Sequence, residues 1–144
     1  MTRQDVVDLI ARWQQAASRR DVQAYAELYS EQAAIESPMA GLASGRNGVI
    51  KAFTAFFSAF PGATIAWEDP IVDGARVSVA AFMSGTDSGG VMGLAPTGKA
   101  FRIPIVFLLE FENGLIVRDR RIYDFTGLLV QVGVLRAKPA WRLP

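Results

Sequence analysis

The hydrophobic pattern divides the chain into a helical first half and a second half of strands. From Arg3 to Arg19, apolar residues recur every three or four positions, which predicts an amphipathic helix with Val6, Leu9, Ile10, Trp13 and Ala17 on one face. Asp21 is a typical N-cap for a short second helix, "VQAYAELYS". A third helix is predicted from Val49 to Phe60, where Pro61 and Gly62 end it. Between them, "AAIESP" is expected to be extended and "MAGLASGRNG" to be loop.

The second half predicts a sheet. Two β-rich runs in residues 64–86 are split at Asp73-Gly74, and two more in residues 99–125 are split at Asn113-Gly114, both typical hairpin turns. Pro104 predicts an edge position or a bulge in its strand. The stretch "TGLLVQVGVLRAKP" is expected to be a short C-terminal helix or coil. Helices followed by a meander indicate an α+β fold, a cone-shaped curved antiparallel sheet with three N-terminal helices packed on its concave face. Such a cone has an apolar pocket at its mouth, suited to a hydrophobic small molecule.

Length and charge exclude several classes of protein. The chain has 144 residues, of which 51% are hydrophobic, so we expect one domain over residues 1–138 and a C-terminal tail over 139–144. Fifteen basic and fourteen acidic residues are scattered along the chain, which argues against a nucleic-acid partner. The apolar runs are too short for a bilayer, and "MTRQDVVDLI" does not resemble a signal peptide. A cytoplasmic protein without a membrane partner is expected.

The residue types that are missing restrict the chemistry. The sequence contains no Cys and no His, so thiol nucleophiles, Ser-His-Asp triads and the commonest zinc ligand are excluded. The loop "SGGVMG" lacks the ending of a phosphate-binding loop, and no other nucleotide motif is present. We therefore expect no metal site and no organic cofactor. Acid–base chemistry near neutral pH would have to use Asp, Glu, Tyr or Lys.

Two aspartates are the candidate catalytic residues. Asp87 follows a strand in the same parity as Val77, Val79, Ala81 and Met83, where an apolar face opens into a glycine-rich loop. Asp124 stands among apolar residues in "IYDFTGLL", and burial there would raise its pKa unless Arg118 or Arg120 offset the effect. The alternative for Asp87 is a turn-forming residue, and for Asp124 a cap or turn residue.

Both faces of the last long strand carry charge. One parity holds Ile116, Arg118, Arg120, Ile122 and Asp124, and the other holds Val117, Asp119, Arg121 and Tyr123. One of these faces is expected to pair charges at a subunit surface or a cavity surface.

Four segments resemble the SnoaL-like polyketide cyclases, a group within the nuclear-transport-factor-2-like superfamily. "YAELYSEQAAIESPMAG" is similar to the family's second helix and first strand, and "GRNGVIKAFTAFFSAFPG" to its third helix. "GTDSGGVMGLAPTGK" resembles its long hairpin loop, and "NGLIVRDRRIYDFTGLLVQVG" its final strand and tail. The last two are the specific motifs. At position 87 the family usually has His, whereas this chain has Asp.

The resemblance implies a cofactor-free acid–base enzyme. It makes Asp124 the general acid/base of an aldol closure or isomerisation, with Asp87 as a second carboxyl group. An epoxide hydrolase is a second hypothesis, in which Asp87, Arg120 and Asp124 would activate water as in the related limonene epoxide hydrolase. A non-catalytic ligand-binding domain is the third. A homodimer is expected by analogy, and the expected substrate-binding residues are Trp13, Tyr29, Phe57, Met83, Met92 and Arg120.

Overall fold

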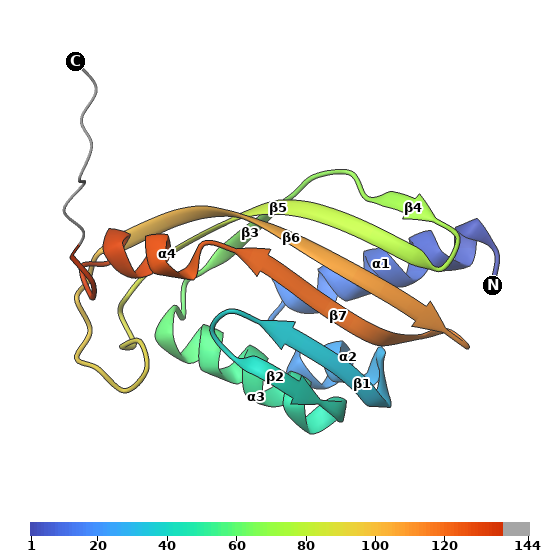
Figure 1. Cartoon of the computed structure of the whole chain (residues 1–144), viewed down its shortest axis with the longest axis horizontal. Helices are drawn as coiled ribbons and strands as arrows, with labels where there is room; N and C mark the ends of the chain where they lie inside the picture. The colour runs from blue at the N-terminus through green and yellow to red at the C-terminus, as the bar shows by residue number, and fades with distance from the viewer. Residues whose placement is uncertain (137–144) are drawn as a thin grey trace, which may run out of the picture.

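The computed structural model describes residues 1–136 and shows an α+β fold (Figure 1). The tail expected from residue 139 lies outside these residues. The helices are α1 (Arg3–Ser18), α2 (Val22–Glu27), α3 (Gly45–Ala59) and α4 (Phe125–Gln131). The strands are β1 (Tyr29–Ser37), β2 (Gly41–Ser44), β3 (Thr64–Trp67), β4 (Ile71–Asp73), β5 (Arg76–Thr86), β6 (Ala100–Glu112) and β7 (Leu115–Tyr123). Within this range no helix has the length and apolar character needed to cross a membrane.

The sheet is mixed rather than purely antiparallel. Its strand order is β2-β1-β7-β6-β5-β3. Strand β4 also pairs with β5, at the start of β5, whereas β3 pairs with the later part of β5. All neighbouring strands are antiparallel except β1 and β7, which run parallel. The expectation of an antiparallel sheet is therefore corrected at this one junction, where the first strand joins the last strand of the meander.

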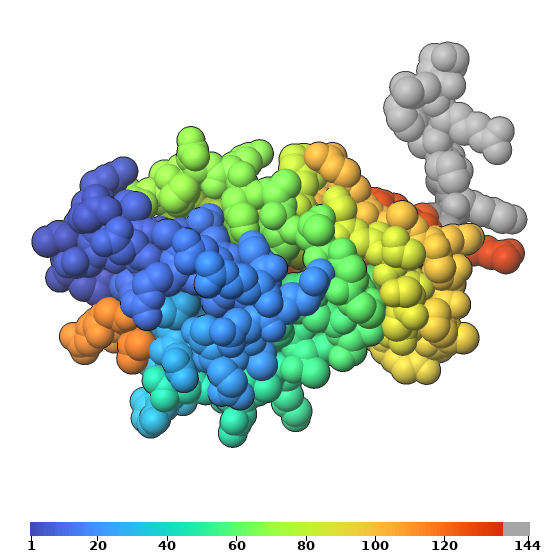
Figure 2. All heavy atoms as spheres, turned by 180° about the vertical axis from the view of Figure 1, so that it is seen from behind, coloured from blue at the N-terminus to red at the C-terminus, as the bar shows by residue number. Residues whose placement is uncertain are grey.

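Helices α1, α2 and α3 lie on one side of the curved sheet, and the core lies between them and its inner face (Figure 1). In the view from behind, the side chains of these helices form one continuous layer (Figure 2). The predicted N-cap is confirmed, since Asp21 accepts a hydrogen bond from Ala24 N–H at 3.1 Å. On α1, Val6, Ile10 and Trp13 are buried, as the periodicity indicates.

Helix α3 begins four residues before its apolar repeat, within the segment predicted as loop. That segment also contains β2, which pairs with β1. Gly45 has a positive φ of 69°, and a Cβ there would lie 2.7 Å from the Glu31 carbonyl oxygen, so only glycine fits. Arg46 Nε then donates to the Tyr29 carbonyl oxygen at 3.0 Å. The first turn of α3 is thus fixed by backbone contacts, which leave no hydrophobic pattern in the sequence.

The β6–β7 hairpin forms as predicted, with Asn113 and Gly114 both at positive φ. Pro104 lies in β6, an interior strand, and the irregularity of this hairpin falls between Glu110 and Phe111 instead. The last residue of β7, Tyr123, pairs with Ile105, so Pro104 lies just beyond the end of β7. On that side β6 is locally an edge, which explains why proline is accommodated.

Candidate active site

A small cavity lies between the inner face of the sheet, α3 and the turn between β1 and β2. Its free volume is about 50 Å³. Most of its lining is apolar and aromatic: Ala17, Met39, Ala40, Ala52, Phe53, Phe56, Phe57, Ile65, Trp67, Met83, Ile105 and Phe107. Its polar groups are few: Tyr25, Ser37, Arg121 and Tyr123. An apolar cavity with a few converging polar side chains is the usual form of a small-molecule site.

An ion pair on β7 supports the polar end of this cavity. Asp119 and Arg121 both face inward, and Arg121 Nη2 donates to Asp119 Oδ2 at 2.9 Å while Nε donates to Oδ1 at 3.3 Å. The Asp119 side chain is 0% exposed and that of Arg121 is 15% exposed. Arg121 lines the cavity, whereas Asp119 lies behind it. The carboxylate therefore fixes the orientation of the guanidinium at the cavity wall.

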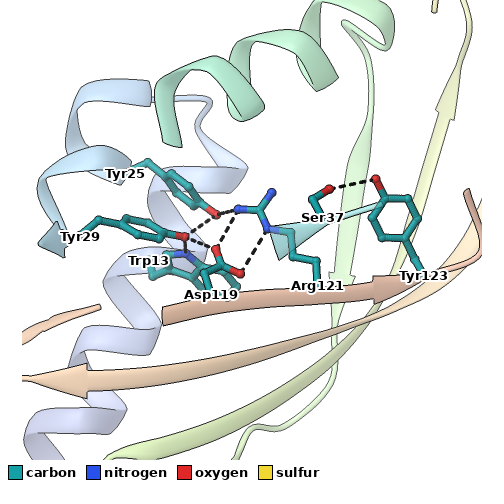
Figure 3. Close-up of polar contacts among 7 residues, drawn as sticks. All are labelled: Trp13, Tyr25, Tyr29, Ser37, Asp119, Arg121 and Tyr123. Atoms are coloured by element: carbon teal, nitrogen blue, oxygen red, sulfur yellow. Dashed lines mark hydrogen bonds and ion pairs between the residues drawn. The ribbon is translucent and has the colours of Figure 1, made fainter. Parts of the chain in front are cut away.

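Three aromatic side chains complete a hydrogen-bonded cluster around this pair (Figure 3). Tyr29 donates to Asp119 Oδ2 at 2.5 Å, and Trp13 Nε1 donates to the Tyr29 hydroxyl at 3.0 Å. The hydroxyl oxygens of Tyr25 and Tyr29 lie 3.2 Å apart, and Arg121 Nη2 donates to Tyr25 at 3.0 Å. Trp13 comes from α1, Tyr25 from α2 and Tyr29 from the start of β1, so the cluster joins both helices to the sheet.

Burial and charge determine the protonation of this cluster. Burial raises the pKa of Tyr25, and burial together with the Asp119 charge raises the pKa of Tyr29 well above its usual value. Burial is the largest single influence on Arg121 and would lower its pKa, but the charge and hydrogen bond of Asp119 together with the neighbouring phenols Tyr25 and Tyr29 outweigh it and hold that pKa well above its usual value. Both phenols are therefore neutral near neutral pH, and the guanidinium is charged.

Two hydrogen-bond donors at the cavity lack a partner. The Nη1 atom of Arg121 points away from Asp119 and makes no hydrogen bond to another described residue (Figure 3). Within residues 1–136, the buried Trp67 Nε1 also has no hydrogen-bond partner. Trp67 packs against Phe107 at a centroid distance of 5.6 Å, and the Arg121 guanidinium lies 5.3 Å from the same ring. Both residues that carry these donors therefore pack against Phe107, which also lines the cavity.

Asp87 is buried, as its strand parity indicated, but it is not among the cavity-lining residues. Its carboxylate accepts hydrogen bonds from Gly90 N–H at 3.0 Å, Thr97 N–H at 3.1 Å and the Thr97 hydroxyl at 3.0 Å. Gly89 N–H donates to the Ala59 carbonyl oxygen at 3.0 Å, at the end of α3. Asp87 therefore holds the loop of residues 87–99 together, and this loop is joined to α3.

Asp124 is exposed and is the N-cap of α4, with Oδ1 accepting from Gly127 N–H at 2.8 Å. The burial on which its expected pKa shift rested is not observed. Arg120 lies on the outer face of the sheet, where its Nε pairs with Glu36 at 2.8 Å. The structure therefore does not bring Asp87, Arg120 and Asp124 into one pocket, and their catalytic roles stay predictions.

The expected substrate-binding residues fall into three groups. Phe57 and Met83 line the cavity. Trp13 and Tyr29 are fully buried in the cluster behind it. Met92 is 61% exposed in the loop of residues 87–99, and Arg120 lies on the outer face.

Sequence reasoning missed Tyr25 and Arg121, which line the polar end of the cavity, and Asp119, which supports them from behind. The available signal was the charged second parity of the last strand, which was noted as a face that pairs charges. Within residues 1–136 no group of three or more acidic side chains is arranged to hold a metal ion.

An α+β cone that encloses a small apolar cavity defines the class of nuclear-transport-factor-2-like folds. A protein from Catenulispora acidiphila with a ketosteroid isomerase-like fold matches with a TM-score of 0.74 at 17% identity, over 87% of this chain and 92% of that one. The model of the SnoaL-like polyketide cyclases matches residues 7–132, so the chain belongs to that family.

Solved structures agree with this assignment. AclR from Streptomyces galilaeus matches with a TM-score of 0.81 at 22% identity, over 96% of this chain and 91% of that one. IdmH from Streptomyces antibioticus, provisionally described as a polyketide cyclase, matches with a TM-score of 0.76 at 28% identity, over 89% and 98%. No curated protein is significantly similar to this chain in sequence.

Proposed function

We propose that this protein is a cofactor-independent acid–base enzyme that enolises a hydrophobic carbonyl compound and then returns the proton, as a cyclase or an isomerase does. Membership of the SnoaL-like polyketide cyclase family supports the reaction class. The observation that carries the site assignment is Arg121, which presents an unpaired Nη1 to an apolar cavity while Asp119 holds its other nitrogens.

Arg121 is the group that would stabilise negative charge on the substrate. When a proton leaves a carbon next to a carbonyl group, charge develops on the carbonyl oxygen, and a fixed donor in a water-poor cavity stabilises it most effectively. The Arg121 guanidinium is already oriented by two hydrogen bonds to Asp119 and by the Phe107 ring. Little reorganisation is therefore needed when the enolate forms.

Tyr25 is the group that would exchange a proton with the substrate. Its hydroxyl lies beside Arg121 Nη2, and its side chain lines the same cavity. The carboxylates of Asp119, Asp87 and Asp124 do not line this cavity. A phenol next to a guanidinium can therefore act where no carboxylate is in reach.

The free volume of the cavity is small for a substrate. About 50 Å³ holds only a few water molecules, whereas sites for drug-sized ligands measure roughly 300–1,000 Å³. The half-buried Phe56 and Phe57 on α3 form part of its wall. Substrate entry therefore requires these side chains, or the turn that carries Met39, to move.

Two cofactor-free assays test the proposal. One follows the conversion of β,γ-unsaturated cyclic ketones to their conjugated isomers by absorbance, and the other follows deuterium uptake from D₂O into 1-tetralone and 2-tetralone by mass spectrometry. The purified protein should catalyse at least one of these reactions, and Arg121→Gln should reduce the rate by about 10²-fold or more. Arg120→Gln is the matched control on the opposite face of β7 and should keep the wild-type rate. Failure of the wild-type protein across the panel, or full activity of Arg121→Gln, would contradict the proposal.

A further inference from the structure

We propose that Asp119 is the final proton acceptor of this site and that it acts on the substrate through Tyr29 and Tyr25. The inference rests on the proposed function and assigns a proton path to it. Tyr25 lines the cavity, whereas Tyr29 and Asp119 lie behind it and are each 0% exposed. Asp119 and Tyr29 would thus take part in the reaction without touching the substrate.

The directions of the hydrogen bonds follow from which groups can donate. The ionised Asp119 can only accept, so the single hydroxyl proton of Tyr29 is directed to Oδ2, 2.5 Å away. Trp13 Nε1 can only donate, and it occupies one lone pair of the Tyr29 oxygen at 3.0 Å. The second lone pair faces the Tyr25 oxygen at 3.2 Å.

The geometry of the 3.2 Å contact alone has Tyr29 donating to Tyr25, but the single proton of Tyr29 is taken by Asp119 at 2.5 Å, so we assign the donor role in this contact to the Tyr25 hydroxyl. The Tyr25 oxygen in turn accepts from Arg121 Nη2 at 3.0 Å and keeps one lone pair for the cavity side. An unbroken chain of donors consequently runs from the cavity through Tyr25 and Tyr29 to Asp119 (Figure 3).

The proton transfer balances along this chain. The substrate C–H bond breaks and its proton binds the Tyr25 oxygen, while the electron pair stays on the substrate as an enolate. The proton of Tyr25 passes to Tyr29, and the proton of Tyr29 passes to Asp119, which becomes a neutral carboxylic acid. The same steps in reverse return a proton to another carbon of the substrate. Arg121 loses the charge of Asp119 at the moment when the enolate charge appears, so the guanidinium stays paired throughout.

Burial makes this path a concerted one. Because burial raises the pKa of both tyrosines, a free tyrosinate is unfavourable at either position. The protons must then move together, and the absence of exposure at Tyr29 and Asp119 keeps water from bypassing them.

The test compares Tyr29→Phe with Tyr123→Phe in the isomerisation assay. Tyr29→Phe should reduce kcat by about 10²–10⁴-fold with little change in KM, since Tyr29 lies behind the cavity. Tyr123→Phe removes a hydroxyl from the cavity wall and can therefore change KM or the rate, but it lies outside the path, so it is the control for the isotope dependence and not for the rate. In mixtures of H₂O and D₂O, wild type and Tyr123→Phe should show a curved dependence of rate on deuterium content, because several protons move at once. Residual activity of Tyr29→Phe should show a linear dependence.

A second variant separates a role in proton transfer from a role in maintaining the fold. Replacing Tyr29 by 3-fluorotyrosine keeps the hydroxyl and the packing but makes the phenol more acidic, so the path predicts a changed kcat, whereas a purely structural role predicts none. If the wild-type protein is active and Tyr29→Phe keeps both the full kcat and the curved dependence on deuterium content, the path is overturned and the proposed function stays intact. Inactivity of the wild-type protein with every ketone would overturn the proposed function, and the path with it.

Discussion

Asp119 and Arg121 lie two residues apart on the inner face of β7 and form a bidentate ion pair, of which only the guanidinium lines the cavity. The same strand carries Arg120 between them, facing outward to Glu36. A single strand thus supplies Arg121 to the cavity and Arg118 and Arg120 to the outer surface. Variants of Arg120 and Arg121 are therefore well matched, because the two residues are neighbours in the sequence and lie on opposite faces of the sheet.

The first prediction concerns stability. Arg121→Met leaves the fully buried Asp119 carboxylate without its charge partner, so the free energy of unfolding should fall by about 3–5 kcal/mol. Chemical denaturation monitored by Trp fluorescence measures the change. Arg120→Met removes a half-exposed pair and should cost no more than about 1 kcal/mol. Equal losses for the two variants would argue against a special role for the buried pair.

The second prediction concerns Asp87. Asp87→Ala removes a carboxylate that accepts three hydrogen bonds inside the loop, so the free energy of unfolding should fall by about 1.5–3 kcal/mol or more. Asp69→Ala, at an exposed position, is the control and should have little effect. If Asp87→Asn kept the stability of wild type and lost all activity in the ketone assays, a catalytic role for Asp87 would be favoured instead.

The third prediction concerns Asp124. Asp124→Ala removes the N-cap of α4 and should lower the free energy of unfolding by about 0.5–2 kcal/mol, whereas Asp124→Ser should retain most of it. Both variants should keep activity, because Asp124 is exposed and does not line the cavity. Loss of deuterium uptake in a stable Asp124→Ser variant would restore Asp124 as the candidate base and contradict the path through Tyr25.

The fourth prediction concerns alkaline pH. The pKa of Tyr25 and of Tyr29 is raised in the folded protein, so folding favours their protonated forms. Their contribution to stability is complete below the unfolded-state pKa of about 10 and is lost progressively as the pH rises above it. Absorbance at the tyrosinate band should show these two residues ionising above pH 10 or together with unfolding. Tyr25→Phe should reduce this delayed amplitude, and normal ionisation near pH 10 in the folded protein would contradict the burial.

The fifth prediction concerns the width of the cavity. Phe57→Ala removes an aromatic ring from its wall and should shift binding from 2-naphthol toward the larger 2-phenanthrol, as measured by ligand fluorescence. Phe82→Ala is the control, since Phe82 packs against Arg102 as Phe57 packs against Arg20, but Phe82 does not line the cavity. An unchanged ratio of the two affinities in Phe57→Ala would show that the wall opens elsewhere.

The helices, the hairpin turns and the family motifs were predictable because each depends on neighbouring residues. Val6, Ile10 and Trp13 show the face of α1, and Asn113-Gly114 identifies a turn whose residues both need a positive φ. The parallel pairing of β1 with β7 was not predictable in this way, because it joins residues that are 84 to 87 positions apart and leaves no local pattern.

The choice between the two charged faces of β7 depends on a register shift. Glu112 pairs with Leu115 and Phe111 with Ile116, and this register would place Arg118 and Arg120 opposite the inward residues of β6. After the irregularity, Leu109 pairs with Asp119 and Phe107 with Arg121 instead. One additional residue in β7 therefore exchanges the faces of all that follow. The pattern of hydrophobic residues does not show this bulge, which is why Asp119 and Arg121 were not selected as site residues.

The contact between Gly89 and Ala59 joins the glycine-rich loop to the end of the helix that carries Phe56 and Phe57. A Cβ at position 89 would lie 1.7 Å from the Ser58 carbonyl oxygen, so any other residue at position 89 would push the loop and the end of α3 apart. The loop is thus part of the support of the cavity wall even though its own side chains lie outside. The shape of the cavity wall can therefore be altered by residues that do not line the cavity, through the position at which α3 ends.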